Sequence, residues 1–300
     1  MSSRRWLLPV ALLPVLCTVA ACGAAQRADV VASFYPLQFV AERVVGDHLA
    51  VRGLTAPGVE PHDLELSPRQ RAALDAARVV LYESGVQPSV DSGVEQSDPG
   101  HVVDAARVVQ LRSFSQHAHD DAAHPSDSPD PHFWLDPTLL AEVARAFADE
   151  AGKADPGHAA DYQRNGKRLV AELDRLDRDF REGLARCRIR TLVVSHDAFG
   201  YLGDRYDLEV VPIAGLSPDA EPSPKRLAEL QRIARDKGVT TIFSETLASP
   251  KMSETLAHDL GLETAVLNPV EGLADEAGNA DYLSLMRENL AAIRKANDCS

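Results

Sequence analysis

Three histidines and one glutamate are the residues of this sequence best suited to hold a metal ion. His62 and His132 each follow a proline, and His196 and Glu271 stand at the ends of predicted buried strands. Prolines fix φ and remove a backbone donor, so an imidazole beside them is presented on a stiff segment. Three neutral imidazoles and one carboxylate form a tetrahedral set that suits Zn²⁺, whereas Mn²⁺ favours more oxygen ligands. We therefore predict a zinc site formed by these four side chains.

The stretch 129–137 organises this prediction, because it holds His132 between prolines and beside Trp134. The loop directly before it is rich in His and Asp and carries three of the ten histidines, His117, His119 and His124. We expect this loop to be an accessory that attracts metal ions toward His132. The alternative interpretation is a proline-rich turn with a histidine near its surface.

The run Ser195-His196-Asp197 is not a catalytic triad, although it contains the three residue types of one. Adjacent residues in a strand point to opposite faces of the sheet, so these side chains cannot act together. The sequence also lacks H-E-x-x-H or a comparable hydrolase motif. A zinc hydrolase, with Glu271 as base, is therefore the weaker alternative.

Predicted strands and helices alternate along most of the chain, which is typical of parallel α/β sheets. Apolar runs predict strands at 29–33, 49–54, 78–82, 190–195, 208–213, 240–244 and 263–267, with a weaker one within 102–109. Apolar periodicity and Ser-Pro or Asp-Pro starts predict helices at 36–46, 136–153, 223–237 and 280–296, and from 67 and 249 onward. Residues 84–100 are rich in Ser, Gly and Pro and are predicted to be a loop.

The longest predicted element is an amphipathic helix of about 28 residues, or about 42 Å, that begins at Asp155-Pro156. A helix of that length can join two lobes stiffly. The predicted fold class is α/β, with two small parallel-sheet β/α lobes, one long rigid joining helix and the metal site in the cleft between the lobes. The predicted domains are an N-terminal lobe at 22–154, the connecting helix at 155–186 and a C-terminal lobe at 187–300.

Length and charge limit the classes of function that fit this chain. Its 300 residues predict about two domains. The formal net charge is −14 and the positive charges are scattered. Nucleic-acid binding needs a basic surface, so that class of function is excluded.

The N-terminus reads as a targeting segment. Arg4 and Arg5 precede an apolar run that is short and contains two prolines, which favours a signal peptide over a membrane-spanning helix. The run ends in small residues directly before Cys22, as in a bacterial lipobox. We predict that residues 1–21 are a lipoprotein-type signal peptide and that lipid on Cys22 anchors the protein to the outer face of the cell membrane. An ordinary secretory signal is the alternative.

Cys17 would be removed with the signal peptide and Cys22 would carry the lipid, so two of the four cysteines are left to pair. They are Cys187 and Cys299, and they would lie in an oxidising compartment. One intramolecular bridge is then possible, which would tie the C-terminal tail to the strand near residue 190. We predict this disulfide, with two free thiols as the alternative.

Four segments of the chain form a specific set in their order and spacing, namely 61–68, 130–137, 195–201 and 267–272, the last followed by 281–289. On these segments the chain resembles the zinc branch of the metal-receptor family (cluster 9, or cluster A-I), the substrate-binding lipoproteins of bacterial ABC transporters. The resemblance covers nearly the whole chain from Cys22 onward. It implies two small parallel-sheet lobes joined by one long helix.

The resemblance also implies which residues bind the metal ion. In similar proteins the first three histidines, here His62, His132 and His196, bind it, and a glutamate placed like Glu271 serves in many zinc members. Glu60 or a water molecule is the alternative fourth ligand. Manganese and iron members usually place acids at the third or fourth position, so His196 favours zinc.

The function implied is extracytoplasmic capture of Zn²⁺ and its delivery to an ABC-transporter permease, by a protein that is not an enzyme. We expect a monomer. A manganese or iron receptor and a metal-dependent surface adhesin of the same fold are the alternatives. Because imidazole ligands must be neutral, affinity should fall as the pH drops through about 6.

Overall fold

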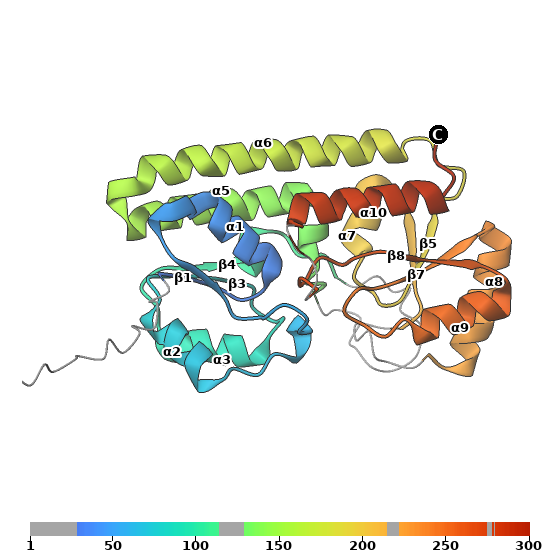
Figure 1. The fold of residues 1–300 in the computed structure, drawn as a ribbon, viewed down its shortest axis with the longest axis horizontal. Coiled ribbons are helices and arrows are strands. Elements are labelled where there is room, and N and C mark those ends of the chain that lie inside the picture. The colour runs from blue at the N-terminus through green and yellow to red at the C-terminus, as the bar shows by residue number, and fades with distance from the viewer. Residues whose placement is uncertain (1–28, 114–128, 215–221, 275–277, 279) are drawn as a thin grey trace, which may run out of the picture.

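The computed structural model describes residues 29–113, 129–214, 222–274, 278 and 280–300. The predicted signal peptide, Cys22 and the histidines at 117, 119 and 124 lie outside the described residues. Two α/β lobes lie side by side, and a bundle of long helices covers both of them (Figure 1). Within the described parts of the chain, none of the helices combines the length and apolarity that crossing a membrane requires.

The first lobe is built on a four-stranded parallel sheet in the order β2-β1-β3-β4. Its strands are β1 (Val30–Ala32), β2 (Val51–Gly53), β3 (Val79–Tyr82) and β4 (Val102–Asp104). Alternate strand residues face opposite sides, so Val30 and Val79 pack in one core and Val31 and Val80 in another. The helices of this lobe are α1 (Tyr35–Val45), α2 (Pro68–Ala76), α3 (Pro88–Ser97), α4 (Ala105–Val108) and α5 (Pro137–Ala154).

The second lobe repeats this design, with a parallel sheet in the order β6-β5-β7-β8. Its strands are β5 (Thr191–Val194), β6 (Glu209–Pro212), β7 (Thr241–Ser244) and β8 (Glu263–Val266). Its helices are α7 (Gly200–Tyr206), α8 (Pro224–Lys237), α9 (Lys251–Leu260) and α10 (Tyr282–Ala296). The strand order reverses between β5 and β7, and ligands of open α/β sheets bind at such a point, beyond the carboxyl ends of the strands.

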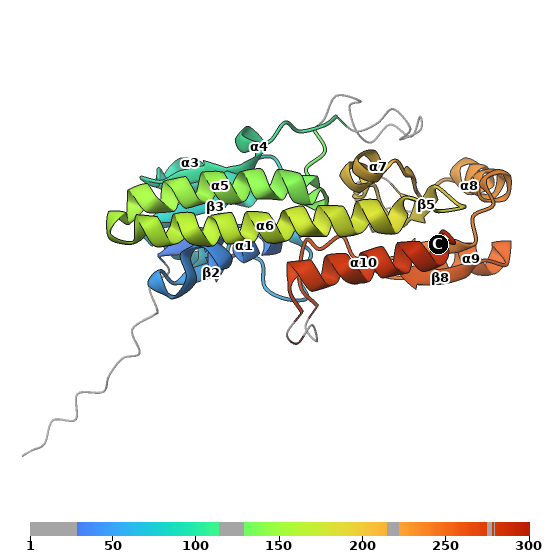
Figure 2. The ribbon, with the colours of Figure 1, turned by 90° about the horizontal axis from the view of Figure 1, so that it is seen from above.

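Helix α6 (Ala159–Leu184) runs across the first lobe and onto the second, beside α5 and α10 (Figures 1 and 2). Its 26 residues span about 39 Å. A buried stripe along it continues one apolar core from the first sheet to the second. Gly166 lies where α5 comes closest, because a Cβ there would stand 3.0 Å from the Cβ of Ala148. The predicted α/β fold with two parallel-sheet lobes and a long joining helix is confirmed.

Two predicted elements differ from the structure. Residues 84–100 are not a loop, because α3 forms there with Pro88 in its first turn and Val90 and Val94 buried against α2. This packing outweighs the low helix propensity of its Ser and Gly residues. The long helix differs only in its first turn: helical structure begins at Pro156 as predicted, but Pro156–His158 form a 3₁₀ turn and the regular α-helix begins at Ala159.

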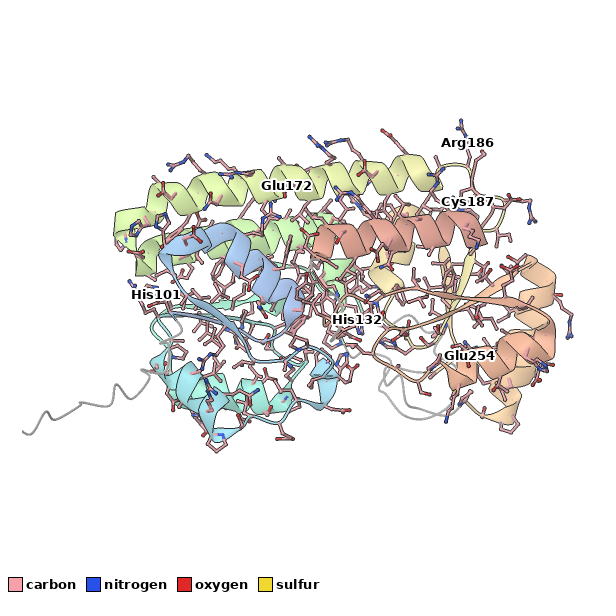
Figure 3. The ribbon with its side chains drawn as sticks, in the orientation of Figure 1. His101, His132, Glu172, Arg186, Cys187 and Glu254 are labelled. Carbon is pink, nitrogen blue, oxygen red and sulfur yellow. A yellow bond between two sulfur atoms is a disulfide. The ribbon has the colours of Figure 1, made fainter. Side chains whose placement is uncertain are left out.

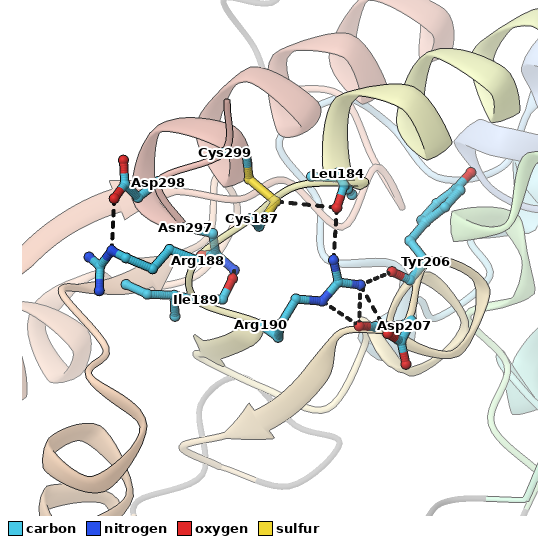
Figure 4. The surroundings of a disulfide bond; sticks show 10 residues. All are labelled: Leu184, Cys187, Arg188, Ile189, Arg190, Tyr206, Asp207, Asn297, Asp298 and Cys299. Atoms are coloured by element: carbon cyan, nitrogen blue, oxygen red, sulfur yellow. Dashed lines mark hydrogen bonds and ion pairs between the residues drawn. A yellow bond between two sulfur atoms is a disulfide. The ribbon is translucent and has the colours of Figure 1, made fainter.

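A disulfide joins Cys187, just after α6, to Cys299, just after α10, as the sequence predicts (Figure 4). Arg188 and Asp298 form an ion pair next to it at 2.8 Å. The Asn297 side chain donates a 3.0 Å hydrogen bond to the carbonyl of Ile189. The C-terminus is therefore tied to the start of the second lobe, which holds α10 against α6.

Candidate metal site

Three of the four predicted ligands follow the carboxyl ends of strands, and His132 lies directly before a short 3₁₀ turn. His62 lies in a 3₁₀ turn, Pro61–Asp63, after β2, and His132 precedes a second such turn, Phe133–Leu135. His196 follows β5 in the second lobe, and Glu271 follows β8. The first two come from one lobe and the other two from its neighbour, and His132 is seen between the lobes in Figure 3.

The structure brings these four side chains together. The ring of His132 stands 5.5 Å, between centroids, from the rings of both His62 and His196. Glu271 Oε2 lies 3.3 Å from His62 Nε2 and 3.9 Å from His132 Nε2. One ring nitrogen of His196 also lies within 4.8 Å of a Glu271 oxygen. Ligand atoms of a tetrahedral zinc site are about 3.3 Å apart, since each lies about 2.0 Å from the ion, so this spacing suits one ion.

Asp130 orients His132 through two hydrogen bonds. The carboxylate oxygen Oδ1 of Asp130 accepts hydrogen bonds from the backbone N–H of His132 at 3.0 Å and from its Nδ1 at 2.9 Å. Burial, followed by the neighbouring imidazoles of His196 and His62, keeps the pKa of His132 well below its usual value. The ring is therefore neutral, with the proton on Nδ1 and the lone pair of Nε2 directed at the other ligands.

Glu245 supports His196 in the same way. Its Oε1 lies 2.6 Å from Nδ1 of His196 and 3.2 Å from the backbone nitrogen of the same residue, and it also accepts from the Ser195 hydroxyl. Neither Glu245 nor the role of Asp130 was predicted from the sequence. The place of Glu245 directly after β7, at the same sheet edge as His196, is the signal that could have found it.

Two of the histidines in the site have raised pKa values, so protons compete with a metal ion for them. Burial acts to lower the pKa of His196, but the charges of Glu245 and Glu271 outweigh it and raise this pKa to about 9. Burial also opposes the charged form of His62, yet Glu271 and Glu60 raise its pKa. The same imidazoles lower the pKa of Glu271 against the effect of its burial. Protonation therefore begins to oppose metal binding at a higher pH than the value of about 6 expected for an unperturbed histidine.

Glu60, the alternative fourth ligand, lies at the edge of the site. Burial and the charge of Glu271 raise the pKa of Glu60 to about 7. One of its carboxylate oxygens accepts from the backbone N–H of His62 at 3.4 Å. The side chain of His62 is 25 % exposed, whereas those of His132 and Glu271 are 0 % and 2 % exposed. The site therefore opens to solvent on the side of His62 and Glu60.

The ligand atoms themselves are buried and lack ordinary partners. Among the described residues, no hydrogen bond is made to Nε2 of His62, His132 or His196, or to Oε2 of Glu271. Buried polar atoms without partners are costly, so a cluster of four that face one another is suited to bind a cation. Within the described ranges, groups able to hold a metal are found only here, as His62, His132 and Glu271 and as His196, Glu245 and Glu271.

One known protein family matches this chain over most of its length. The family model described as zinc-uptake complex component A, periplasmic (ZnuA), matches residues 30–296. The chain belongs to the ZnuA family. Members are the substrate-binding components of zinc-uptake ABC transporters rather than enzymes, and they work with a membrane permease. Zn²⁺ is thus the transported ion of this family and not a cofactor.

Individual relatives agree with this assignment. The high-affinity zinc uptake system protein ZnuA of Bacillus subtilis is 35 % identical over 295 residues, which cover 92 % of each chain. The zinc-binding lipoprotein AdcA of Streptococcus pneumoniae is 32 % identical over 96 % of this chain, which spans only 60 % of AdcA. The Zn(II)-bound ZnuA-like domain of AdcA has a TM-score of 0.76 at 30 % identity, with 91 % and 99 % of the two chains covered.

A third relative combines metal transport with a second activity. The laminin-binding protein Lmb of Streptococcus agalactiae is described as a bifunctional protein with adhesin and metal-transporting activity. Its structure has a TM-score of 0.78 at 31 % identity, with 90 % of this chain and 99 % of that chain covered.

Proposed function

We propose that His62, His132, His196 and Glu271 bind one Zn²⁺ between the two lobes, as the cargo of a zinc-uptake ABC transporter. The observation that carries this proposal is the convergence of four buried, unpartnered ligand atoms from both lobes. All four positions are filled by protein side chains, which suits binding without catalysis. Asp130 and Glu245 orient two of the imidazoles from behind.

The ligand chemistry favours zinc over manganese or iron. Three imidazole nitrogens and one carboxylate form a four-coordinate set, and the second carboxylate near His196 accepts from its Nδ1 instead of facing the ion. Mn²⁺ prefers more oxygen ligands and a larger coordination number. A manganese or iron receptor is therefore the weaker alternative.

Entry and release of the ion occur on the His62 side. This imidazole is the most exposed of the three and stands on a short 3₁₀ turn, whereas His132 and His196 are fully buried. His62 is therefore the last ligand to bind and the first to leave. Docking on a permease that favours an arrangement without the His62 contact would release the ion.

The remaining parts of the proposal concern segments outside the described residues. Residues 1–21 act as a lipoprotein signal peptide, and lipid on Cys22 holds the protein at the outer face of the membrane, as the name of AdcA supports. The histidines at 117, 119 and 124 attract zinc near the site, because their loop ends directly before Asp130. The protein works as a monomer with lobes at 22–154 and 187–300, joined through 155–186.

Adhesion to laminin is a second candidate function, favoured by the likeness to Lmb. The Zn(II)-bound domain of AdcA has an equally similar fold. The likeness in fold therefore does not single out adhesion, and the buried ligand cluster favours zinc transport. Binding of immobilised laminin by this protein would support the second function.

Titration of the metal-free protein with Zn²⁺ in the presence of excess Mn²⁺ tests the proposed function. One zinc per chain is expected, and Glu271→Gln is expected to weaken binding by about 100-fold. One of four ligands contributes roughly 3 kcal/mol of a total on the order of 10–16 kcal/mol, which gives that factor.

Glu60→Gln is the matched control for Glu271→Gln. It should weaken zinc binding by about fivefold or less, because a partly exposed carboxylate outside the ligand set acts only through its charge. The reverse ranking of the two variants would make Glu60 the fourth ligand. Preferential binding of Mn²⁺ would overturn the zinc assignment.

Zinc affinity is expected to rise with pH between 7 and 9. The pKa of His196 is raised to about 9 in the metal-free site, so its proton is bound at pH 7 and must leave when zinc binds. Each proton released makes the affinity rise by about tenfold per pH unit over this range. Titrations in zinc buffers at pH 7, 8 and 9 measure the slope, and calorimetry in two buffers counts the protons.

Glu245→Gln removes the charge that raises the pKa of His196 and serves as the control for this pH dependence. In this variant the rise in affinity should shift to lower pH. An affinity that is independent of pH between 7 and 9 in the unmodified protein would contradict a protonated His196.

A further inference from the structure

The segment that carries Glu271 has an unusual backbone. Val270 has φ of 56°, in the left-handed region, and is completely buried. A β-branched residue is a genuine outlier there, because its side chain is crowded against the backbone. Strained residues persist only where their surroundings impose the conformation, and they cluster at functional sites. Contacts around Val270 must therefore hold this segment in place.

One set of these contacts comes from α10. Asn289, which is 2 % exposed, accepts from the backbone N–H of Asn268 at 2.8 Å and donates to the carbonyl of the same residue at 2.6 Å. The Asn268 side chain in turn accepts from the backbone N–H of Val270 at 2.8 Å. The amide of Asn289 thus pairs with the backbone as a neighbouring strand would, and it fixes the chain three residues before Glu271.

The other contact comes from the opposite lobe. The indole N–H of Trp134 donates to the carbonyl of Pro269 at 2.8 Å. Trp134 lies two residues after His132, its ring stands 5.3 Å from that imidazole, and Tyr282 donates to its backbone carbonyl. The segment before Glu271 is therefore hydrogen-bonded to the same short stretch that carries His132.

We propose that Asn289 and Trp134 are positioning residues that hold Val270 in its strained conformation and thereby direct the Glu271 carboxylate at the zinc ion. Neither side chain faces the ion itself, so each acts through the backbone of Asn268 and Pro269. This inference rests on the proposed function, since it assigns a role in binding zinc. It predicts that the effect of Asn289 on affinity exists only while Glu271 is a ligand.

A double-mutant cycle tests this dependence. Asn289→Ala is expected to weaken zinc binding by about 10- to 100-fold, the usual cost of losing a residue that orients a metal ligand. In a protein that already carries Glu271→Ala, the same change should alter the affinity by about threefold or less. The visible absorption of bound Co²⁺, which reports the coordination geometry, should change in Asn289→Ala but not further in the double variant.

Asn297→Ala is the matched control. Asn297 directly follows α10, is 2 % exposed like Asn289 and donates to a backbone carbonyl, that of Ile189, which lies outside the ligand segment. Its loss should lower thermal stability as a buried hydrogen bond does, and leave zinc affinity and the Co²⁺ spectrum unchanged. Trp134→Phe, which removes the indole N–H donor and keeps an aromatic ring, gives the same test if Asn289→Ala does not fold.

The outcomes separate this proposal from the proposed function. An equal loss of affinity with and without Glu271, or no loss from either Asn289→Ala or Trp134→Phe, would overturn the positioning role alone. If Glu271→Ala binds zinc as tightly as the unmodified protein, the fourth ligand is wrong and the positioning role falls with it.

Discussion

His132→Ala is expected to lower the zinc affinity of this protein by about 1000-fold. This imidazole is completely buried, and its ring lies between those of His62 and His196, at 5.5 Å from each. Asp130 already holds its Nδ1–H, so its orientation costs nothing further when the ion binds. The loss corresponds to roughly 4 kcal/mol, the upper end of one ligand's share of the binding free energy. Competition with a chelator of known affinity measures it.

His258→Ala is the control for this prediction. The side chain of His258 is 89 % exposed and pairs with Asp259, so its loss should leave zinc affinity within about twofold. His101, at the outer edge of the first lobe, is a second control (Figure 3). Retention of zinc affinity in His132→Ala would end the proposal that the buried cluster is the zinc site.

Replacing both cysteines of the disulfide, as Cys187→Ser with Cys299→Ser, is expected to lower the free energy of unfolding by about 4–5 kcal/mol. The bridge closes a loop with a sequence separation of 112, and closing so long a loop restricts the unfolded chain strongly. The bridge lies at the outer end of α6 and α10, away from His132 in Figure 3. Zinc affinity should therefore be retained. Urea unfolding of the metal-free protein measures the change.

Arg188→Ala gives the comparison for the disulfide variant. It removes the exposed ion pair with Asp298 beside the bridge, whose side chains are 63 % and 69 % exposed. Such pairs contribute about 1 kcal/mol or less. A double cysteine variant that loses no more than Arg188→Ala would show that the bridge does not stabilise the fold.

Most of the fold could be predicted from the sequence because its local signals agree with its final packing. Apolar runs locate the strands, and proline in the first turn marks the start of α2, α5 and α8. The exception is α3, whose Ser and Gly residues favour a loop. There Gly93 allows the close approach of Leu66 and Leu74, within 2.9 Å of where its Cβ would stand. That benefit exists only once α2 is in place.

The four proposed ligands of the candidate site carry local sequence signals, whereas the residues that support them do not. His62, His132, His196 and Glu271 follow strands or stiff turns, and the structure brings them together. Glu245 carries no comparable local signal, since a single acid after a strand is common. Its contact with His196 arises because β5 and β7 are neighbours in the second sheet, although these two residues are 49 positions apart in the sequence.

The sequence by itself determined the type of each lobe, the long helix and the proposed zinc ligands, because these depend on short-range patterns of apolar side chains, prolines and histidines. Only the tertiary structure decided which atoms of these side chains face one another, which pKa values are raised and how the Glu271 segment is held. Those properties depend on burial and on carboxylates, amides and an indole supplied by distant parts of the chain. A local pattern contains no information on distances of a few ångströms between such groups.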